Sequence, residues 1–167
     1  MNRYATLDRL ADSLEGSLKY DGISRAIYST DASMYREEPL AVAWPAGEND
    51  LELLVEHAGS HDTSLIMRGA GTSLAGQVVG PGIVVDISRH MNSILEINPE
   101  EKWVRVQPGV VLEELNKRLA GEGLFFGPET STANRCTLAG MLGNNACGLH
   151  SLRYGSTREH TLEVKTI

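Results

Sequence analysis

Residues 66–77 read IMRGAGTSLAGQ, an apolar run that gives way to Arg68 and then to three glycines within eight positions, Gly69, Gly71 and Gly76. A glycine inside regular structure costs roughly 0.5–1 kcal/mol relative to alanine. This density therefore indicates either backbone with positive φ or another group that approaches the main chain closely. The stretch predicts a buried strand that ends in a phosphate-binding loop.

The spacing of these glycines excludes two common nucleotide-binding motifs. A dinucleotide fingerprint needs a third glycine where Leu74 stands, followed by a helix, whereas residues 80–82 read Gly-Pro-Gly and break the chain. A P-loop is excluded because Gln77 and Val78 replace the Lys and the Ser/Thr that contact phosphate and magnesium. A nucleotide hydrolase is therefore disfavoured.

A nest of consecutive backbone N–H groups fits the loop better. The hydroxyls of Thr72 and Ser73 would add donors, and Arg68 would add positive charge. The alternative is a tight polar surface loop whose glycines serve its geometry alone.

Composition limits the partners of the chain. Its 167 residues are 41% hydrophobic and 22% charged, with a formal net charge of −7. The apolar stretches fall far short of the roughly 20 residues that cross a bilayer, and the basic residues are too scattered for a nucleic-acid surface. We expect a cytoplasmic protein with no membrane span, no nucleic-acid partner and reduced thiols.

Hydrophobic periodicity predicts an α+β fold with a helical extension at residues 1–37 and two lobes, 38–90 and 91–167. In the first lobe, β-type runs at 40–45, 64–67 and 83–88 and a helix capped by Asn49 or Asp50 predict a small, mainly parallel α/β lobe.

The second lobe is predicted to be largely antiparallel. Runs at 93–97 and 102–106 flank a turn and predict a hairpin with Leu95 and Ile97 facing one side. Leu112, Leu115 and Leu119 form a helical stripe. Residues 161–167 read as a strand without a following turn, so we expect a fragment of a longer protein with this lobe truncated.

A second cluster of small residues lies between Pro128 and Gly155. Gly140, Gly143 and Gly148 remove side-chain bulk there, which suits either a ligand or close packing of a helix on a sheet. Two such surfaces would fit one long ligand.

Taken in order, these segments resemble the FAD-binding domain of the vanillyl-alcohol oxidase / p-cresol methylhydroxylase superfamily, in its FAD-linked oxidase branch. Within it the chain is most similar to the N-terminal part of the flavin subunits of glycolate oxidase and D-lactate dehydrogenase. The matching segments are RGAGTSLAG at 68–76, VVDISRHMNSI at 84–94, VQPGVVLEELN at 106–116, GPETST at 127–132 and GNNACGLHSLRYGSTREH at 143–160.

The resemblance implies an extended FAD between the two lobes and assigns residues to it. Those along the pyrophosphate would be Arg68, Gly69, Ala70, Gly71, Thr72 and Ser73. Beside the isoalloxazine it places Pro128, Glu129 and Thr130. Along the length of the cofactor it places Thr137, Gly140, Asn144 and Gly148. Tyr154 and Gly155 would close over the cofactor, and Val164 would lie at its adenine end.

Two positions depart from the family pattern. Relatives with a covalently attached flavin carry His where Thr72 stands, so we expect non-covalent FAD. The usual paired glycine is here Ala139-Gly140, which leaves slightly less room for the cofactor.

The resemblance also implies oxidation of a 2-hydroxy acid of the D-lactate or glycolate type by hydride transfer to flavin. The substrate-side residues would come from a following C-terminal domain, so no catalytic base is nominated here. An iron–sulfur region is possible in the full-length protein. Two alternatives stay open. One is a binding or assembly module that has lost the cofactor. The other is a reductase of the UDP-N-acetylmuramate type, which the segment NNACGLHSLRYG at 144–155 disfavours.

The histidines and cysteines do not predict a further site. His57 and His61 have metal-ligand spacing, but Gly59-Ser60 should end their helix and no third ligand is adjacent, so we expect no metal. Cys147 is expected to be a compact buried group, and Cys136, beside Arg135, is the candidate for reactivity.

Overall fold

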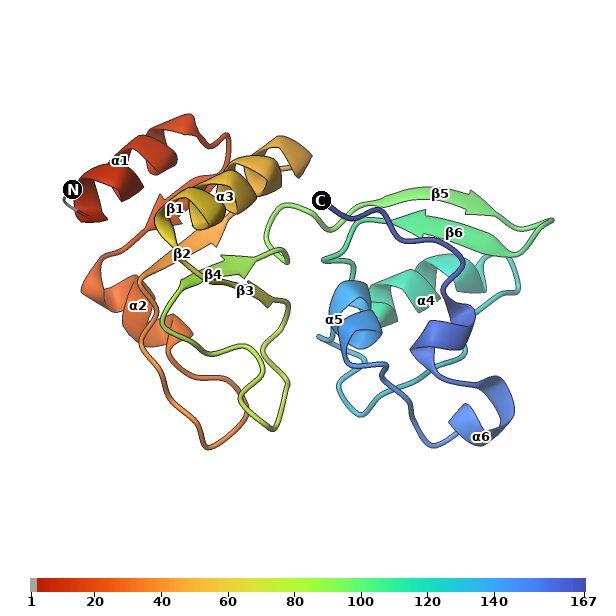
Figure 1. Ribbon diagram of the computed structural model, residues 1–167. Helices are drawn as coiled ribbons and strands as arrows, with labels where there is room; N and C mark the ends of the chain where they lie inside the picture. Colours follow the sequence, from red (N-terminus) through yellow and green to blue (C-terminus); the bar gives the residue numbers. More distant parts are fainter. Residues whose placement is uncertain (1–2) are drawn as a thin grey trace. The chain divides into compact units, whose positions relative to one another are not determined.

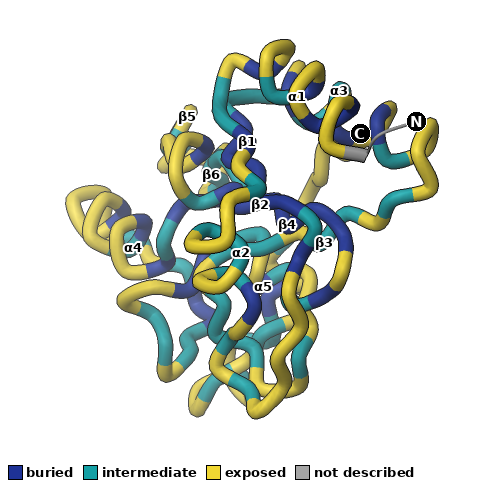
Figure 2. The backbone as a smooth tube through the Cα atoms, turned by 90° about the vertical axis from the view of Figure 1, so that its left-hand side faces the viewer, coloured by how far each residue is buried: buried dark blue, intermediate teal, exposed yellow. Residues whose placement is uncertain are grey.

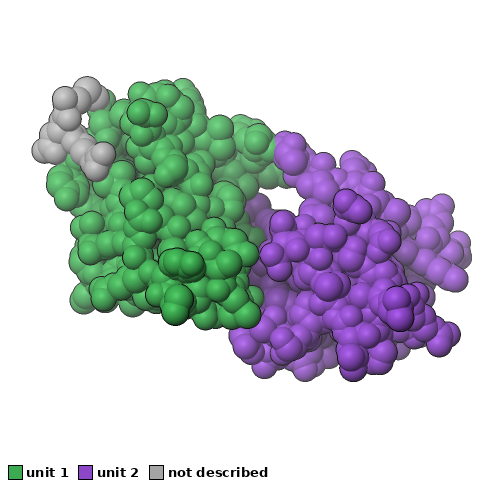
Figure 3. Space-filling model, turned by 60° about the horizontal axis from the view of Figure 1, so that its bottom comes forward, with its two compact units in different colours: residues 1–90, 167 green, residues 91–166 purple. Residues whose placement is uncertain are grey.

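The computed structural model describes residues 3–167 and divides into two compact units. Unit 1 spans residues 1–90 together with residue 167, and unit 2 spans residues 91–166 (Figure 3). Residues 1–2 of the expected helical extension lie outside the described residues. Helices together with parallel and antiparallel strands confirm the α+β fold class.

Unit 1 is built on a four-stranded sheet in the described part of the chain, with the order β1-β2-β4-β3. Its strands are β1 (Ser17–Lys19), β2 (Ala41–Trp44), β3 (Leu65–Arg68) and β4 (Ile83–Asp86). β4 pairs in parallel with β2 and β3, as the sequence predicts. Every residue of β2 and β4 is buried, which is typical of central parallel strands.

The helices of unit 1 cover this sheet. They are α1 (Arg3–Ser13), α2 (Gly22–Tyr28) and α3 (Glu48–His61). Figure 1 shows α1 and α3 side by side on one side of the sheet and α2 on the other. Residues 3–37 pack into unit 1 rather than extending from it, because β1 pairs antiparallel with β2 and the stripe of Leu7, Leu10 and Leu14 is buried.

The start of α3 differs from the expectation. Gly47 is the N-cap and makes no side-chain cap, so capping by Asn49 or Asp50 is wrong. The carboxylate of Asp50 is buried instead and accepts hydrogen bonds from the N–H groups of Glu15, Gly16 and Ala46 at 2.7–2.9 Å. One side chain therefore joins α3 to the segment that leads into β1 and to the turn after β2.

The other end of α3 also differs. The helix runs through Gly59 and Ser60 to His61, and Asp62 ends it in the left-handed region with φ 48°. A single glycine weakens a helix by about 1 kcal/mol but does not end it, and the termination comes from Asp62.

Unit 2 combines a hairpin with short helices. Its elements are β5 (Ile94–Asn98), β6 (Trp103–Val106), α4 (Leu112–Ala120), α5 (Leu138–Gly143), α6 (Ser151–Tyr154) and the 3₁₀ helix η1 (Thr157–His160). The predicted hairpin is confirmed, but a register irregularity between Ile94 and Glu96 exposes 57% of Leu95. Ile94 and Ile97 face the core instead, because the irregularity breaks the two-residue alternation.

The core of unit 2 lies under α4. Leu112, Leu115 and Leu119 are all buried, which confirms the helical stripe (Figure 2). The strand expected at 161–167 is wrong for the described chain, since this segment pairs with no strand and Leu162 exposes 82% of its surface. An extended segment becomes a strand only where a neighbour accepts its backbone hydrogen bonds.

Replacing Asp50 with Asn should destabilise unit 1 by about 2–4 kcal/mol, because the buried uncharged amide has one acceptor oxygen for three N–H donors. Urea denaturation followed by circular dichroism measures the change. Glu52→Gln is the matched control, since it removes the same charge from an exposed position of the same helix. Indistinguishable unfolding midpoints for the two variants would contradict the role given to Asp50.

Candidate functional site

The glycine loop, which we define as residues 69–82, begins where β3 ends. Parallel pairing places Arg68 opposite Asp86, so β3 and β4 stop at the same sheet edge. In open α/β sheets, ligands bind outside the carboxyl ends of the parallel strands. The predicted phosphate loop therefore leaves the sheet at the edge where ligands bind in open α/β sheets.

The backbone of the glycine loop has unused hydrogen-bond donors. Within residues 3–167, the one N–H of this loop that donates to another group of the chain is that of Ala75, to Gln77 Oε1 at 3.1 Å. The N–H groups of residues 69–73 have no acceptor in the described chain, although residues 71–73 are partly buried. Partly buried donors of this kind need an acceptor, and an anion can supply one.

The conformation of the loop depends on Gly71. Its φ of 66° lies in the left-handed region, and a Cβ built there would lie 2.6 Å from Nη2 of Arg68. Arg68 also donates from Nη1 to the carbonyl of Thr30 at 2.8 Å, and its guanidinium lies 5.0 Å from the ring centroid of Tyr28. The charge of Arg68 is therefore held beside the unused donors.

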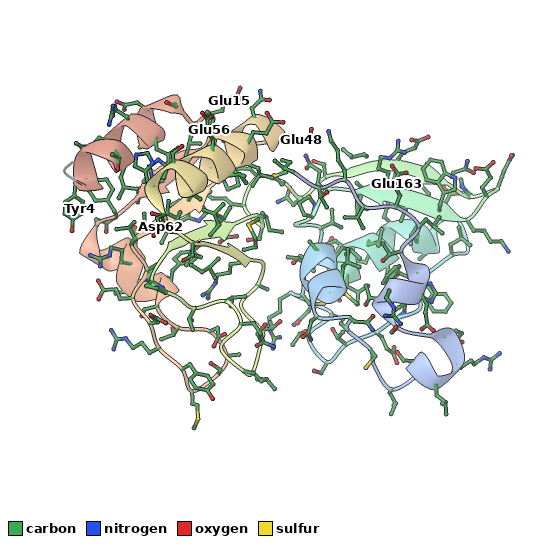
Figure 4. All side chains as sticks on the ribbon, viewed as in Figure 1. Tyr4, Glu15, Glu48, Glu56, Asp62 and Glu163 are labelled. Atoms are coloured by element: carbon green, nitrogen blue, oxygen red, sulfur yellow. The ribbon has the colours of Figure 1, made fainter. Side chains whose placement is uncertain are left out.

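Some acidic side chains of unit 1 lie away from the glycine loop, whereas Asp86 lies opposite Arg68 at the sheet edge where the loop begins. Glu15, Glu48 and Glu56 point outward on the side of α1 and α3, away from the glycine loop (Figure 4). Arg68 and the backbone donors of the loop, rather than the net charge of −7, are therefore what favours an anion here.

A buried hydrogen-bond network below Arg68 was missed by the sequence analysis. The Tyr28 hydroxyl donates to Asp86 Oδ2 at 2.6 Å and accepts from Trp44 Nε1 at 2.9 Å. Ser88 donates to Asp86 Oδ1 from both its N–H and its hydroxyl. Burial and the Asp86 hydrogen bond raise the pKa of Tyr28 to about 12. The available signal was Asp86 itself, a charged residue that closes the apolar strand IVVD.

Unit 2 brings several predicted residues together around Glu129. A Cβ built on Gly148 would lie 1.6 Å from the carbonyl oxygen of Glu129, so no other residue fits there. The Glu129 carboxylate contacts Nδ1 of His150, and the Tyr154 ring meets Phe125 edge-on with centroids 5.4 Å apart. Close packing therefore accounts for Gly148.

The remaining predicted residues of unit 2 lie on or near α5. Thr137 is the N-cap, and its hydroxyl accepts from the Gly140 N–H at 3.3 Å, while Asn144 is the C-cap. Thr130 Oγ1 lies 3.2 Å from the sulfur of Cys136. Val164 makes no backbone hydrogen bond to this group among the described residues, and half of its surface is exposed.

The other titratable groups form no further site. His57 and His61 stack with ring centroids 4.2 Å apart, and burial followed by the charge of His61 lowers the pKa of His57. Residues 3–167 contain no group of three His, Cys, Asp or Glu side chains that could hold a metal. The expectations for the thiols are reversed, since Cys136 is buried against Leu112 and Met141 whereas Cys147 is exposed. None of the described helices is long and apolar enough to span a bilayer.

Comparison with known proteins identifies similar sequences. The FAD binding domain family matches residues 39–167. D-2-hydroxyglutarate dehydrogenase of Pseudomonas putida is 44% identical over 165 residues, which cover 96% of this chain and 16% of that protein. Glycolate oxidase subunit GlcD of Bacillus subtilis is 32% identical over 86% of this chain and 31% of its own length. The chain thus spans less than a third of either relative.

Solved structures share the fold. 6-Hydroxy-D-nicotine oxidase from Arthrobacter nicotinovorans superposes with a TM-score of 0.75 at 25% identity, covering 87% of this chain and 32% of that one. Alkyldihydroxyacetonephosphate synthase reaches a TM-score of 0.83 over 95% of this chain and 35% of its own, and at 22% identity it supports the fold alone.

Tyr28 should be the last tyrosine of the chain to ionise. Its raised pKa means that its contribution to stability is complete below pH 10 and is lost as the pH rises through about 12. Absorbance at 295 nm during an alkaline titration measures tyrosinate formation. In Tyr28→Phe the step near pH 12 should disappear, and its persistence would contradict the assignment.

Proposed function

The chain belongs to the FAD binding domain family, and we propose that it forms the FAD-holding part of an enzyme that oxidises a 2-hydroxy acid. Two of its relatives are named for the 2-hydroxy acids D-2-hydroxyglutarate and glycolate. The proposed range of substrates is therefore broader than the expected D-lactate or glycolate, because relatives of 40–47% identity are named for D-2-hydroxyglutarate. The 2-hydroxy-acid class is the level that these relatives support.

The unused N–H groups of residues 69–73 carry this proposal. A diphosphate presents several anionic oxygens, and each can accept from a backbone donor without placing a charged side chain in contact. Arg68 adds a positive charge beside Gly71, where the loop turns. The residues present therefore fit the pyrophosphate of FAD.

The residues of this chain would bind and orient the cofactor rather than carry out the chemistry. FAD, when bound, supplies a flavin ring that accepts hydride from the substrate. Arg68 and residues 69–73 would hold the diphosphate. We propose contacts along the rest of the cofactor for the predicted residues of unit 2, Pro128, Glu129, Thr130, Thr137, Gly140, Asn144, Gly148, Tyr154, Gly155 and Val164. We assign no catalytic base to this chain.

We further propose that the FAD is held without a covalent bond. Thr72 stands at the position where the covalent relatives carry His, and its hydroxyl is a poor partner for flavin attachment.

Acid precipitation of the FAD-loaded protein should therefore release all of the flavin into the supernatant. Absorbance near 450 nm of the supernatant and of the redissolved pellet measures the two fractions. Yellow colour that stays with the pellet would show a covalent bond and overturn this part of the proposal.

Ala70→Pro should weaken FAD binding about 10- to 100-fold, because it removes a donor to a charged acceptor worth about 1.5–3 kcal/mol. The Ala70 N–H has no acceptor among residues 3–167, so the variant loses no hydrogen bond of its own fold. Isothermal titration with FAD and competition by ADP measure the affinity. Leu74→Pro, four residues further along the same loop, is the control and should bind FAD within about twofold of the unaltered chain.

A colourless protein that also fails to bind added FAD would favour the alternative, a module that has kept the fold and lost the cofactor. If Ala70→Pro and the unaltered chain bound FAD with equal affinity, the loop would not be part of the binding site, and the family assignment would be unaffected.

A further inference from the structure

The segment that precedes the family match contacts the glycine loop. The match to the FAD binding domain family begins at residue 39, yet residues 28–35, which we call the strap, supply the protein partners of Arg68, Gly71 and Gly76. Strap and loop are about 40 residues apart in the chain and both belong to unit 1. A segment that precedes the matched domain thus helps to shape the loop inside it.

The contact at Gly71 fixes the direction of a donor. The Ala32 N–H donates to the Gly71 carbonyl oxygen at 3.0 Å. That carbonyl and the Thr72 N–H belong to one planar trans peptide unit and point in opposite directions. Because the carbonyl is held toward the strap, the Thr72 N–H points away from it, and it is one of the unused donors of residues 69–73.

Two further contacts hold the loop, one at its start and one near its middle. Arg68 donates to the Thr30 carbonyl at 2.8 Å and lies over the ring of Tyr28. Near the middle of the loop, a Cβ built on Gly76 would lie 2.9 Å from the Tyr35 ring, so this ring packs directly on the loop backbone. The strap therefore touches the loop at its start, at its turn and beyond the donors.

The strap itself is anchored. The Tyr28 hydroxyl donates to buried Asp86, and an antiparallel bridge between Thr30 and Arg36 closes the segment on itself. Asp31 keeps one buried carboxylate oxygen without a hydrogen-bond partner among residues 3–167. A buried polar atom without a partner is unfavourable and is typical of segments held in place for function.

We propose that the strap is a positioning element for the diphosphate: it holds residues 69–73 with their N–H groups oriented for the anion before FAD arrives. The inference rests on the proposed function, because it concerns the same loop. Preorganisation raises affinity by removing the loss of conformational freedom that binding would otherwise require. Strap residues then influence FAD binding without touching the cofactor.

Ala32→Pro tests the proposal, since it deletes the N–H that binds the Gly71 carbonyl at an exposed position. We expect FAD and ADP binding to weaken about 3- to 10-fold, the equivalent of one hydrogen bond. The thermal midpoint without FAD should stay within about 2 °C. Met34→Pro is the matched control, because the Met34 N–H has no acceptor in the described chain, and its affinity should be unchanged.

Hydrogen exchange provides a measurement that a purely structural role would not alter. In the unaltered chain, FAD should protect the amides of residues 69–73, and in Ala32→Pro that protection should be reduced at Thr72 first. Full protection in Ala32→Pro together with unchanged affinity would overturn the proposal. An apo-protein destabilisation that matches the loss of affinity would overturn it as well, by showing that the strap acts on the fold in general.

Tyr35→Ala provides a second test if Ala32→Pro does not fold. The Tyr35 ring is more than half exposed, so its removal leaves the core intact while freeing the loop at Gly76. Met34→Ala is its control, with a side chain 91% exposed. FAD affinity equal to that of the control would count against the strap. Failure of the unaltered chain to bind FAD would be a failure of the proposed function, and it is recognised before any strap variant is measured.

Discussion

The parallel pairing of β3 with β4 determines where both strands stop, and the candidate site follows from that constraint. The register places Arg68 opposite Asp86 at one sheet edge. From there Arg68 reaches Thr30 and Asp86 reaches Tyr28, so the strap is joined to both strand ends. The glycine loop leaves from the same point with its backbone donors unused. A shift of one residue in the register would exchange the two faces of β3 and separate these groups.

Local patterns in the sequence were enough to predict much of the fold. The apolar runs gave the three parallel strands, the two-residue alternation gave the β5–β6 hairpin, and the leucine stripe gave α4. The glycine density at residues 69–76 placed the loop correctly after β3, because glycine is the residue that adopts positive φ most readily. The FAD cofactor of the family followed from the ordered motifs.

The features that could not be predicted depend on contacts between distant segments. Asp50 reads as a helix cap in its local sequence, yet its carboxylate serves N–H groups more than 30 residues away. Tyr28 and Asp86 are 58 residues apart, and no spacing pattern in the sequence predicts the hydrogen bond between them. The exposure of Leu95 required the register irregularity in the hairpin, and the burial of Cys136 depends on its packing against Leu112 and Met141. Each case was decided by tertiary packing rather than by local propensity.

The antiparallel strand β1 has a consequence for the exchange of domains between relatives. The match to the FAD binding domain family begins at residue 39, but the sheet begins at Ser17, and β1 covers the edge of β2 with its backbone hydrogen bonds. A chimera that joins residue 39 to a segment without a strand equivalent to β1 would uncover that edge, and an uncovered apolar strand offers a template for pairing with other chains. Recombination junctions that keep the edge covered therefore belong upstream of β1, in a part of the chain that the matched domain leaves out.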